Sequence, residues 1–186
     1  MSPSTVVDRV VSSASDRVEL LGIELLEEHA RRLAASFTVS RHPLGSGRTH
    51  LRRLAENRRA LTETYNLLAG DVRRGELASP AMEWLLDNFY VIAGAGRDVV
   101  RDLPSPYFRR LPTIAADDFK GMPRIYALAL ELIRTSSGQI DAQRLSRFIV
   151  AFQSVTPLTI GELWAWSSVL KLALIEHLRG RADVMV

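Results

Sequence analysis

The sequence contains no cysteine and no long hydrophobic run that is free of charge. The absence of cysteine excludes disulfide bonds, thiolate metal ligands and a cysteine nucleophile, and it is compatible with a reducing compartment. The most apolar stretch, residues 160–178, is interrupted by Glu162, Lys171, Glu176 and His177. A membrane-spanning helix needs about 20 predominantly apolar residues. We therefore predict a buried helix there and no membrane span.

The beginning of the sequence also lacks the pattern of a secretory signal. Asp8 lies where a continuous apolar segment would be needed, and no small-residue cleavage site follows it. We therefore expect a cytoplasmic location. The 186 residues, 47% hydrophobic and 24% charged, fit one globular domain large enough to bury its own core, and this balance excludes intrinsic disorder.

Lysine is scarce, and the positive charge is concentrated in one part of the chain. Only Lys120 and Lys171 are lysines among 24 basic residues, a bias to which we assign no function. Residues 31–59, the basic region, contain eight arginines and the single acid Glu56, a local charge of +7 in a chain of net charge +3. The arginines are Arg31, Arg32, Arg41, Arg48, Arg52, Arg53, Arg58 and Arg59. We expect a positive field at one end of the molecule and a candidate surface for an anionic partner.

Apolar residues recur at spacings of three and four along most of the chain, which is typical of amphipathic helices. No run alternates for long enough to predict a strand. The fold class is therefore predicted to be all-α, a single-domain bundle of about six helices that spans residues 1–186. The predicted helices are residues 15–38, 49–74, 80–102, 123–135, 141–154 and 160–179.

Several helix ends carry a local signal. Ser79 is predicted to be the N-cap of a helix that begins at Pro80, because serine caps helices well and proline suits the first helical position. Asp141 is predicted to cap the helix that follows it. Gly180 is predicted to end the last helix, since glycine is common just beyond a helix C-terminus.

The strongest of these signals lies before the last helix. Thr159 and Glu162 match a capping box, in which each side chain accepts a hydrogen bond from the backbone N–H of the other residue. Leu158 and Leu163 match the hydrophobic staple that often accompanies such a box. We interpret these four residues as a structural cap.

Residues 103–122 form one long predicted connection. The segment contains three prolines and three aromatic residues: Pro104, Pro106, Pro112, Tyr107, Phe108 and Phe119. Connections longer than about 12 to 15 residues are uncommon in compact domains and are often functional. We favour a structural interpretation, in which the aromatic side chains cover one end of the bundle, and keep a functional loop as the alternative.

No arrangement of residues predicts a metal, a cofactor or a catalytic residue. The histidines are His29, His42, His50 and His177. They lack the spacing of a metal site, and we expect surface or capping roles for them. Glu83 and Asp87 share a helix face and could form a catalytic carboxylate pair, but we interpret them as a solvated face. Asp117 and Asp118 lack the Asp-x-Asp spacing that holds a divalent cation in nucleotide-sugar transferases.

Two glycine pairs and one arginine need an explanation of their own. Gly45 and Gly47 are not preceded by a strand or followed by Lys-Ser/Thr, so they do not predict a phosphate loop. Gly94 and Gly96 lie within a helical pattern, where the missing side chain would let a neighbouring helix come close. Arg58 occupies an apolar position, and we expect its stem to pack while its guanidinium reaches the surface or an acid. A ligand contact is the alternative for Arg58.

The clearest similarity to a known family lies in residues 148–166, FIVAFQSVTPLTIGELWAW, and continues through residues 170–179, LKLALIEHLR. Further matching segments are residues 26–33, LEEHARRL; 83–90, EWLLDNFY; 106–112, PYFRRLP; and 123–132, PRIYALALEL. In this order the segments resemble the N-terminal region of bacterial cyclic β-1,2-glucan synthases.

The resemblance implies a relation to very large inner-membrane enzymes that polymerise glucose from UDP-glucose. Their transferase motifs, membrane spans and phosphorylase-like domain have no counterpart in this chain, so the resemblance implies no catalytic residue. It implies the remainder of such a synthase, with its transferase and membrane domains, as the partner. It also implies a location at the cytosolic face of the inner membrane.

Two hypotheses of different classes follow. The first is a non-catalytic helical domain of a glucan synthase with a scaffold or assembly role, which would show no glucosyltransferase activity by itself. In a membrane synthase the basic region of such a domain would face the anionic inner leaflet. The second hypothesis is an independent module that binds anionic polymers, nucleic acid included, through the basic region. Nucleic acid is disfavoured, because Phe37 is the only aromatic residue in that region and stacking on bases needs several.

Overall fold

The computed structural model describes residues 22–40, 49–116 and 118–184, and these residues form an all-α bundle, as predicted. The helices are α2 (Ile23–Ser36), α3 (Thr49–Arg73), α4 (Pro80–Asp102), α5 (Ser105–Phe108), α6 (Arg124–Thr135), α7 (Ala142–Gln153) and α8 (Ile160–Ala182). Two short strands, β1 (Val39–Ser40) and β2 (Thr113–Ile114), pair antiparallel, with Val39 opposite Ile114.

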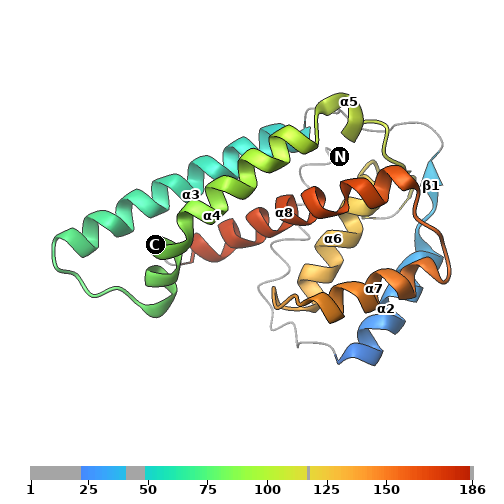
Figure 1. The fold of residues 1–186 in the computed structure, drawn as a ribbon, viewed down its shortest axis with the longest axis horizontal. Helices are drawn as coiled ribbons and strands as arrows, with labels where there is room; N and C mark the ends of the chain where they lie inside the picture. The colour runs from blue at the N-terminus through green and yellow to red at the C-terminus, as the bar shows by residue number, and fades with distance from the viewer. Residues whose placement is uncertain (1–21, 41–48, 117, 185–186) are drawn as a thin grey trace.

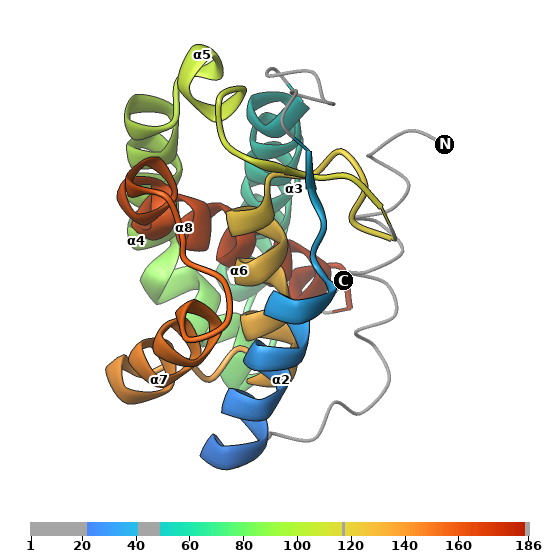
Figure 2. The ribbon, with the colours of Figure 1, turned by 90° about the vertical axis from the view of Figure 1, so that its right-hand side faces the viewer.

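Helix α8 lies at the centre of the molecule and packs against α3, α4 and α6. Figure 1 shows α3 and α4 as an antiparallel hairpin with α8 alongside, and the contacts among these three helices define a three-helix bundle. The second group contains α2 and α7, which pack against each other beside α6 (Figure 2).

The central position of α8 explains its composition. Buried residues such as Ala165, Val169, Leu172 and Ile175 occupy more than one side of the helix. A helix with apolar residues on most sides must be covered on most sides. Residues 160–178 therefore form a helix, as predicted; none of residues 168–178 is exposed, whereas the first turns of the helix keep exposed side chains.

The ends of two helices differ from the prediction by more than one residue. Helix α2 ends at Ser36 and not at residue 38, because Phe37 is extended and the chain continues into β1. The predicted part of this helix before Gly22 lies outside the described residues. Helix α8 continues past Gly180 to Ala182, so the predicted stop at Gly180 was wrong. Continuing the helix buries Ala182 beside the first turn of α4.

The connection at residues 103–122 is more regular than predicted, since it contains both α5 and β2. The prediction of no strand therefore missed the β1–β2 pair, whose strands are too short to show alternation. Phe108 is buried and stacks on the ring of His50 at a centroid distance of 3.8 Å. Phe119 meets Phe37 edge to face at 5.8 Å. These contacts support the structural interpretation of the connection.

Helices α3 and α4 approach closely at Gly96. A Cβ atom at this position would lie 2.7 Å from Cδ and 3.0 Å from Nε of Arg58. The absence of a side chain at Gly96 therefore makes room for the stem of Arg58, which packs in the way the sequence predicted. Because no ion pair holds the Arg58 guanidinium within the described part of the chain, packing of the stem is its observed role.

We expect Gly96→Ala to lower the free energy of unfolding by about 1 kcal/mol, because the new methyl group overlaps the Arg58 stem. Gly94→Ala is a matched control in the same helix, where the nearest atom would be Arg97 Nη2 at 3.7 Å. This control should raise the free energy of unfolding by up to about 1 kcal/mol through helix propensity alone. Urea unfolding measures both effects.

In an Arg58→Ala background the overlap disappears, so Gly96→Ala should become stabilising there. If Gly96→Ala stabilises the wild-type chain as much as Gly94→Ala does, the close approach of Arg58 to Gly96 is not the constraint described above.

Candidate functional site

Three glutamates, Glu131, Glu162 and Glu176, are buried within helices whose other buried residues are mainly apolar. An ionised carboxylate in such surroundings is costly unless it is paired and hydrogen-bonded. Each of the three meets a partner from another helix. Because perturbed and buried ionisable groups are also common at active sites, they are the first candidates for chemistry in this molecule.

The best-buried pair joins Arg124, at the start of α6, to Glu162, in the first turn of α8. Arg124 Nε donates to Glu162 Oε1 at 2.9 Å and Arg124 Nη2 donates to Oε2 at 2.7 Å, a two-bond, fork-like contact. The two side chains are 5% and 0% exposed. Arg124 Nη2 also donates to the carbonyl of Pro157 at 3.1 Å, and its guanidinium lies 5.8 Å from the ring centroid of Phe152.

The same glutamate caps α8. Thr159 N donates to Glu162 Oε2 at 2.8 Å, and Glu162 N donates to Thr159 Oγ1 at 3.2 Å, which is a capping box. Sequence reasoning found this box but missed that Arg124 binds the same carboxylate. Leu158 is buried whereas Leu163 is largely exposed, so the staple between them stays a prediction.

Glu176 of α8 contacts side chains of α3 and α6 and so connects three helices. Arg53 of α3 donates from Nε to Glu176 Oε1 at 2.8 Å, and the hydroxyl of Tyr126 of α6 donates to Oε2. Arg53 is therefore mostly buried in an ion pair. This corrects its assignment to an exposed basic surface.

Glu131 connects α6 to α2. His29 Nε2 lies 2.9 Å from Glu131 Oε2, and Arg134 Nη2 donates to the same oxygen at 2.6 Å. Burial acts to raise the pKa of Glu131, but the hydrogen bonds from His29 and Arg134 outweigh burial, and the pKa lies below its usual value. The carboxylate is therefore held in its charged form, which is the form that serves as an ion-pair partner.

The contact of His50 with the C-cap residue of α4 agrees with the predicted capping role, whereas partly buried His29 has an ion-pair role that was not predicted. His50 is buried, with Nε2 2.9 Å from the carbonyl oxygen of Leu103. His29 binds buried Glu131, as described above. Burial, together with the charge of Arg181, lowers the pKa of His177. His42 lies outside the described residues, and among those described no three His, Asp or Glu side chains form a group that could hold a metal ion.

The arginines of the basic region do not form one free patch. Arg31 pairs with Glu27 at 3.3 Å, Arg52 with Glu56 at 3.6 Å and Arg59 with Glu63 at 2.9 Å, in each case one helical turn apart. Arg32 is exposed on α2, which lies apart from α3 in both views (Figures 1 and 2). Arg41 and Arg48 lie outside the described residues. The prediction that these arginines face an anionic surface stays a prediction, with fewer free charges than the sequence indicated.

The remaining sequence candidates lie on the surface. Glu83 and Asp87 are exposed on α4, and Asp118 is exposed in the connection before α6. Asp117 and the Gly45–Gly47 segment lie outside the described residues. Nothing in the described structure brings Glu83, Asp87 and Asp118 together with a buried polar partner.

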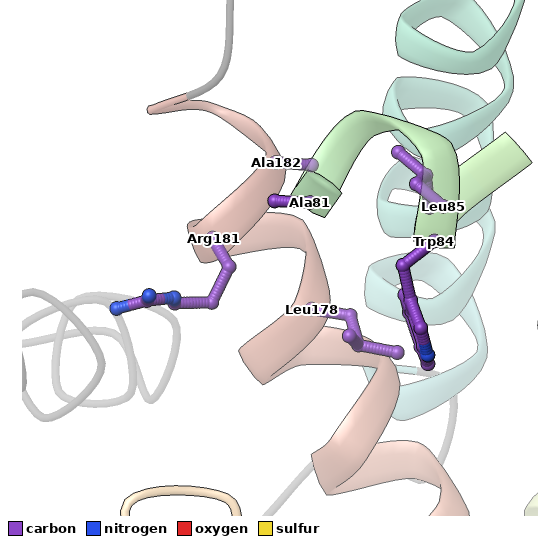
Figure 3. A pocket seen from close by; sticks show the side chains of 6 residues that line it. All are labelled: Ala81, Trp84, Leu85, Leu178, Arg181 and Ala182. Atoms are coloured by element: carbon purple, nitrogen blue, oxygen red, sulfur yellow. The ribbon is translucent and has the colours of Figure 1, made fainter. Parts of the chain in front are cut away.

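A shallow apolar hollow of ≈ 200 Å³ lies between the start of α4 and the end of α8 (Figure 3). It is lined by Ala81, Trp84, Leu85, Leu178, Arg181 and Ala182. The only charged side chain of this lining, Arg181, extends away from the other labelled side chains. With its apolar lining and a half-exposed Trp84, the hollow fits an apolar side chain better than a charged nucleotide sugar.

The fold and its buried ion pairs define an all-α helical bundle whose charged core residues hold helices together. No family model matches the chain. The chain is 37% identical over 124 residues to Cyclic beta-(1,2)-glucan synthase NdvB of Rhizobium meliloti (strain 1021). The aligned part is 67% of this chain and 4% of that synthase. The chain is therefore homologous to a small region of a glucan synthase, in agreement with the resemblance found in the sequence.

The length and apolar character of the helices decide whether any of them could cross a bilayer. None of the helices in residues 22–40, 49–116 and 118–184 has both the length and the apolar character that spanning a membrane requires.

We expect single substitutions in the Arg124–Glu162 pair to be strongly destabilising. Arg124→Met or Glu162→Gln leaves the other group buried without its partner, which typically costs about 3–5 kcal/mol. The double substitution should cost clearly less than the sum of the two, because it removes both charges together. Urea unfolding of the three variants and the wild type measures the coupling.

Arg101→Ala is the matched control, since Arg101 pairs with Asp98 and Asp102 at the surface. Its stability should stay close to that of the wild type. Additive losses for Arg124→Met and Glu162→Gln would show that the two side chains do not stabilise each other in solution.

Proposed function

We propose that the chain is a non-catalytic helical module of a cyclic β-glucan synthase, with a scaffold or assembly role toward the other parts of that enzyme. The observation that carries this proposal is the homology to a region that makes up only 4% of NdvB. A bundle of this size cannot represent the whole synthase. We therefore infer that the bundle contributes to the synthase through contacts with the transferase and membrane parts.

The contacts made by the buried ionisable groups support a non-catalytic role. Glu131, Glu162 and Glu176 are buried and bound to arginine, histidine or tyrosine side chains of the bundle. A general acid or base must reach the proton that it transfers. Carboxylates whose oxygens already bind other helices are poorly placed for this task. We therefore propose that the chain by itself transfers no glucose, and that it acts on the cytosolic side of the inner membrane as part of the synthase.

The hollow beside Trp84 is the surface that best fits such a contact. Trp84 and the neighbouring Leu178 offer an apolar recess, and tryptophan is among the residues that contribute most to protein–protein binding. A partner helix or loop of the synthase with one protruding apolar side chain would fill it. Exposed Tyr90, also on α4 but outside this lining, provides a control position.

The proposal predicts that this bundle can replace the homologous region of NdvB. A synthase without its own region should lose assembly, and a chimera that carries residues 22–184 of this chain should regain it. Trp84→Asp in the chimera should reduce the amount of assembled synthase and its glucan synthesis at least severalfold, whereas Tyr90→Asp should not. The measurements are the amount of full-length protein in membranes and glucan formed from UDP-glucose.

The thermal midpoints of the two isolated variants should match that of the wild type, since both side chains are at least half exposed. A synthase that assembles and works fully without the homologous region would rule out the scaffold role.

A further inference from the structure

The first turn of α8 carries three large apolar side chains on its outer face. Ile160, Leu163 and Trp164 are 75%, 43% and 81% exposed. Their spacing of three and four residues places them on one side of the helix. On the inner side of the same turn, Glu162 and Ala165 are buried. The capping box and the ion pair of Glu162 fix this turn, so the exposure is imposed by the fold and is not that of a frayed helix end.

The shape of this face points to the kind of partner it fits. Ile160 and Trp164 protrude with most of their surface in water, and Val155 in the preceding turn is half exposed as well. A rigid protein partner would need a separate pocket for each protruding side chain. The interfacial layer of a bilayer is fluid and can close around them, and tryptophan side chains favour this layer.

The charge at this end of the molecule also fits a lipid surface. The hydroxyl of Tyr107 donates to the carbonyl of Gly161 at 2.5 Å, which holds α5 beside the first turn of α8. Arg109 and Arg110 follow α5 directly and are exposed. Neither forms an ion pair with any residue that the structure describes.

The acids near this end are already paired. Glu162 binds Arg124, and Asp102 binds Arg101. Arg109 and Arg110 therefore provide positive charge that no neighbouring carboxylate cancels. Each arginine close to an anionic bilayer contributes attraction that salt weakens.

We propose that the α5–α8 corner, formed by Arg109, Arg110, Ile160, Leu163 and Trp164, binds the surface of an anionic lipid bilayer. The apolar side chains enter the headgroup layer, and the two guanidinium groups bind lipid phosphates. This inference goes beyond the scaffold role, which concerns contact with other parts of a protein. It also differs from the sequence prediction of an anionic surface at the basic region, where most described arginines are paired with glutamates.

The test uses the isolated chain and sedimentation with vesicles of phosphatidylglycerol or of phosphatidylcholine. At low salt the chain should bind phosphatidylglycerol and bind phosphatidylcholine much more weakly. The double substitution Arg109→Ala/Arg110→Ala should weaken binding roughly thirtyfold, from the loss of two arginine–lipid attractions. Ile160→Ser/Trp164→Ser should weaken it at least as much. All of these side chains are exposed, and an unchanged thermal midpoint checks that the variants fold.

Two matched controls make the experiment specific. Trp84→Ser removes a half-exposed tryptophan of α4, which lies beside the C-terminal end of α8, and should leave binding unchanged. Arg52→Ala/Arg59→Ala removes two arginines of the basic region and should have little effect. With brominated phosphatidylglycerol and Trp166→Phe as the common background, quenching of tryptophan fluorescence should persist in Trp84→Phe and fall sharply in Trp164→Phe.

Several results would overturn the proposal. One is an absence of binding to phosphatidylglycerol at low salt, and another is equal binding to both lipids. A third is binding that depends on Arg52 and Arg59 but not on Arg109 and Arg110, which would favour the basic region. If Ile160→Ser/Trp164→Ser keeps full vesicle binding but loses assembly with the synthase, the corner is a protein contact and not a lipid contact.

Discussion

The Arg124–Glu162 ion pair is the interaction on which the arrangement of the second half of the chain depends. It joins the start of α6 to the start of α8, and through Pro157 and Phe152 it also fixes the connection from α7. Because Glu162 caps α8 with the same carboxylate, the beginning of the central helix and the position of α6 are set together. This contact between the starts of α6 and α8 therefore also sets the orientation of exposed Ile160 and Trp164.

The other two buried glutamates extend the same principle to the rest of the bundle. Glu176 ties α8 to α3 and α6, while Glu131 ties α6 to α2. Charges that look like candidates for catalysis are thus bound within the fold. What remains for interaction is the surface: an apolar hollow beside Trp84 at one end of α8, and a corner with protruding apolar side chains and unpaired arginines at the other.

The features that could be predicted from the sequence are those that depend on residues close together in the chain. The caps at Ser79, Asp141 and Thr159 are local signals, and each is present in the structure. Helix periodicity likewise predicted the fold class, and the apolar run of residues 160–178 predicted the buried later turns of α8. Gly180 did not stop its helix, because a buried position two residues later favoured continuation over the local preference of glycine.

Long-range pairing could not be predicted in this way. Arg53 looked like one arginine among eight, and only the fold brings it to Glu176, 123 residues along the chain. Arg124 and His29 gave no local sign of a buried partner. The intrahelical pairs of Arg52 with Glu56 and of Arg59 with Glu63 could have been predicted from their spacing, however. Glu56 is already counted in the local charge of +7, so of these two glutamates only Glu63, outside residues 31–59, would have reduced the expected positive field.

The buried ionisable groups are bound within the fold, and we propose that the chain by itself transfers no glucose. The most direct test of this proposal is incubation of the pure chain with UDP-glucose and a divalent cation, followed by assays for free UDP and for glucose added to any tyrosine. We expect UDP release no higher than in buffer and no added mass. UDP release above that level, abolished by replacing exposed Glu83, Asp87 or Asp118 or the neighbouring Asp117, would contradict it and identify a catalytic domain.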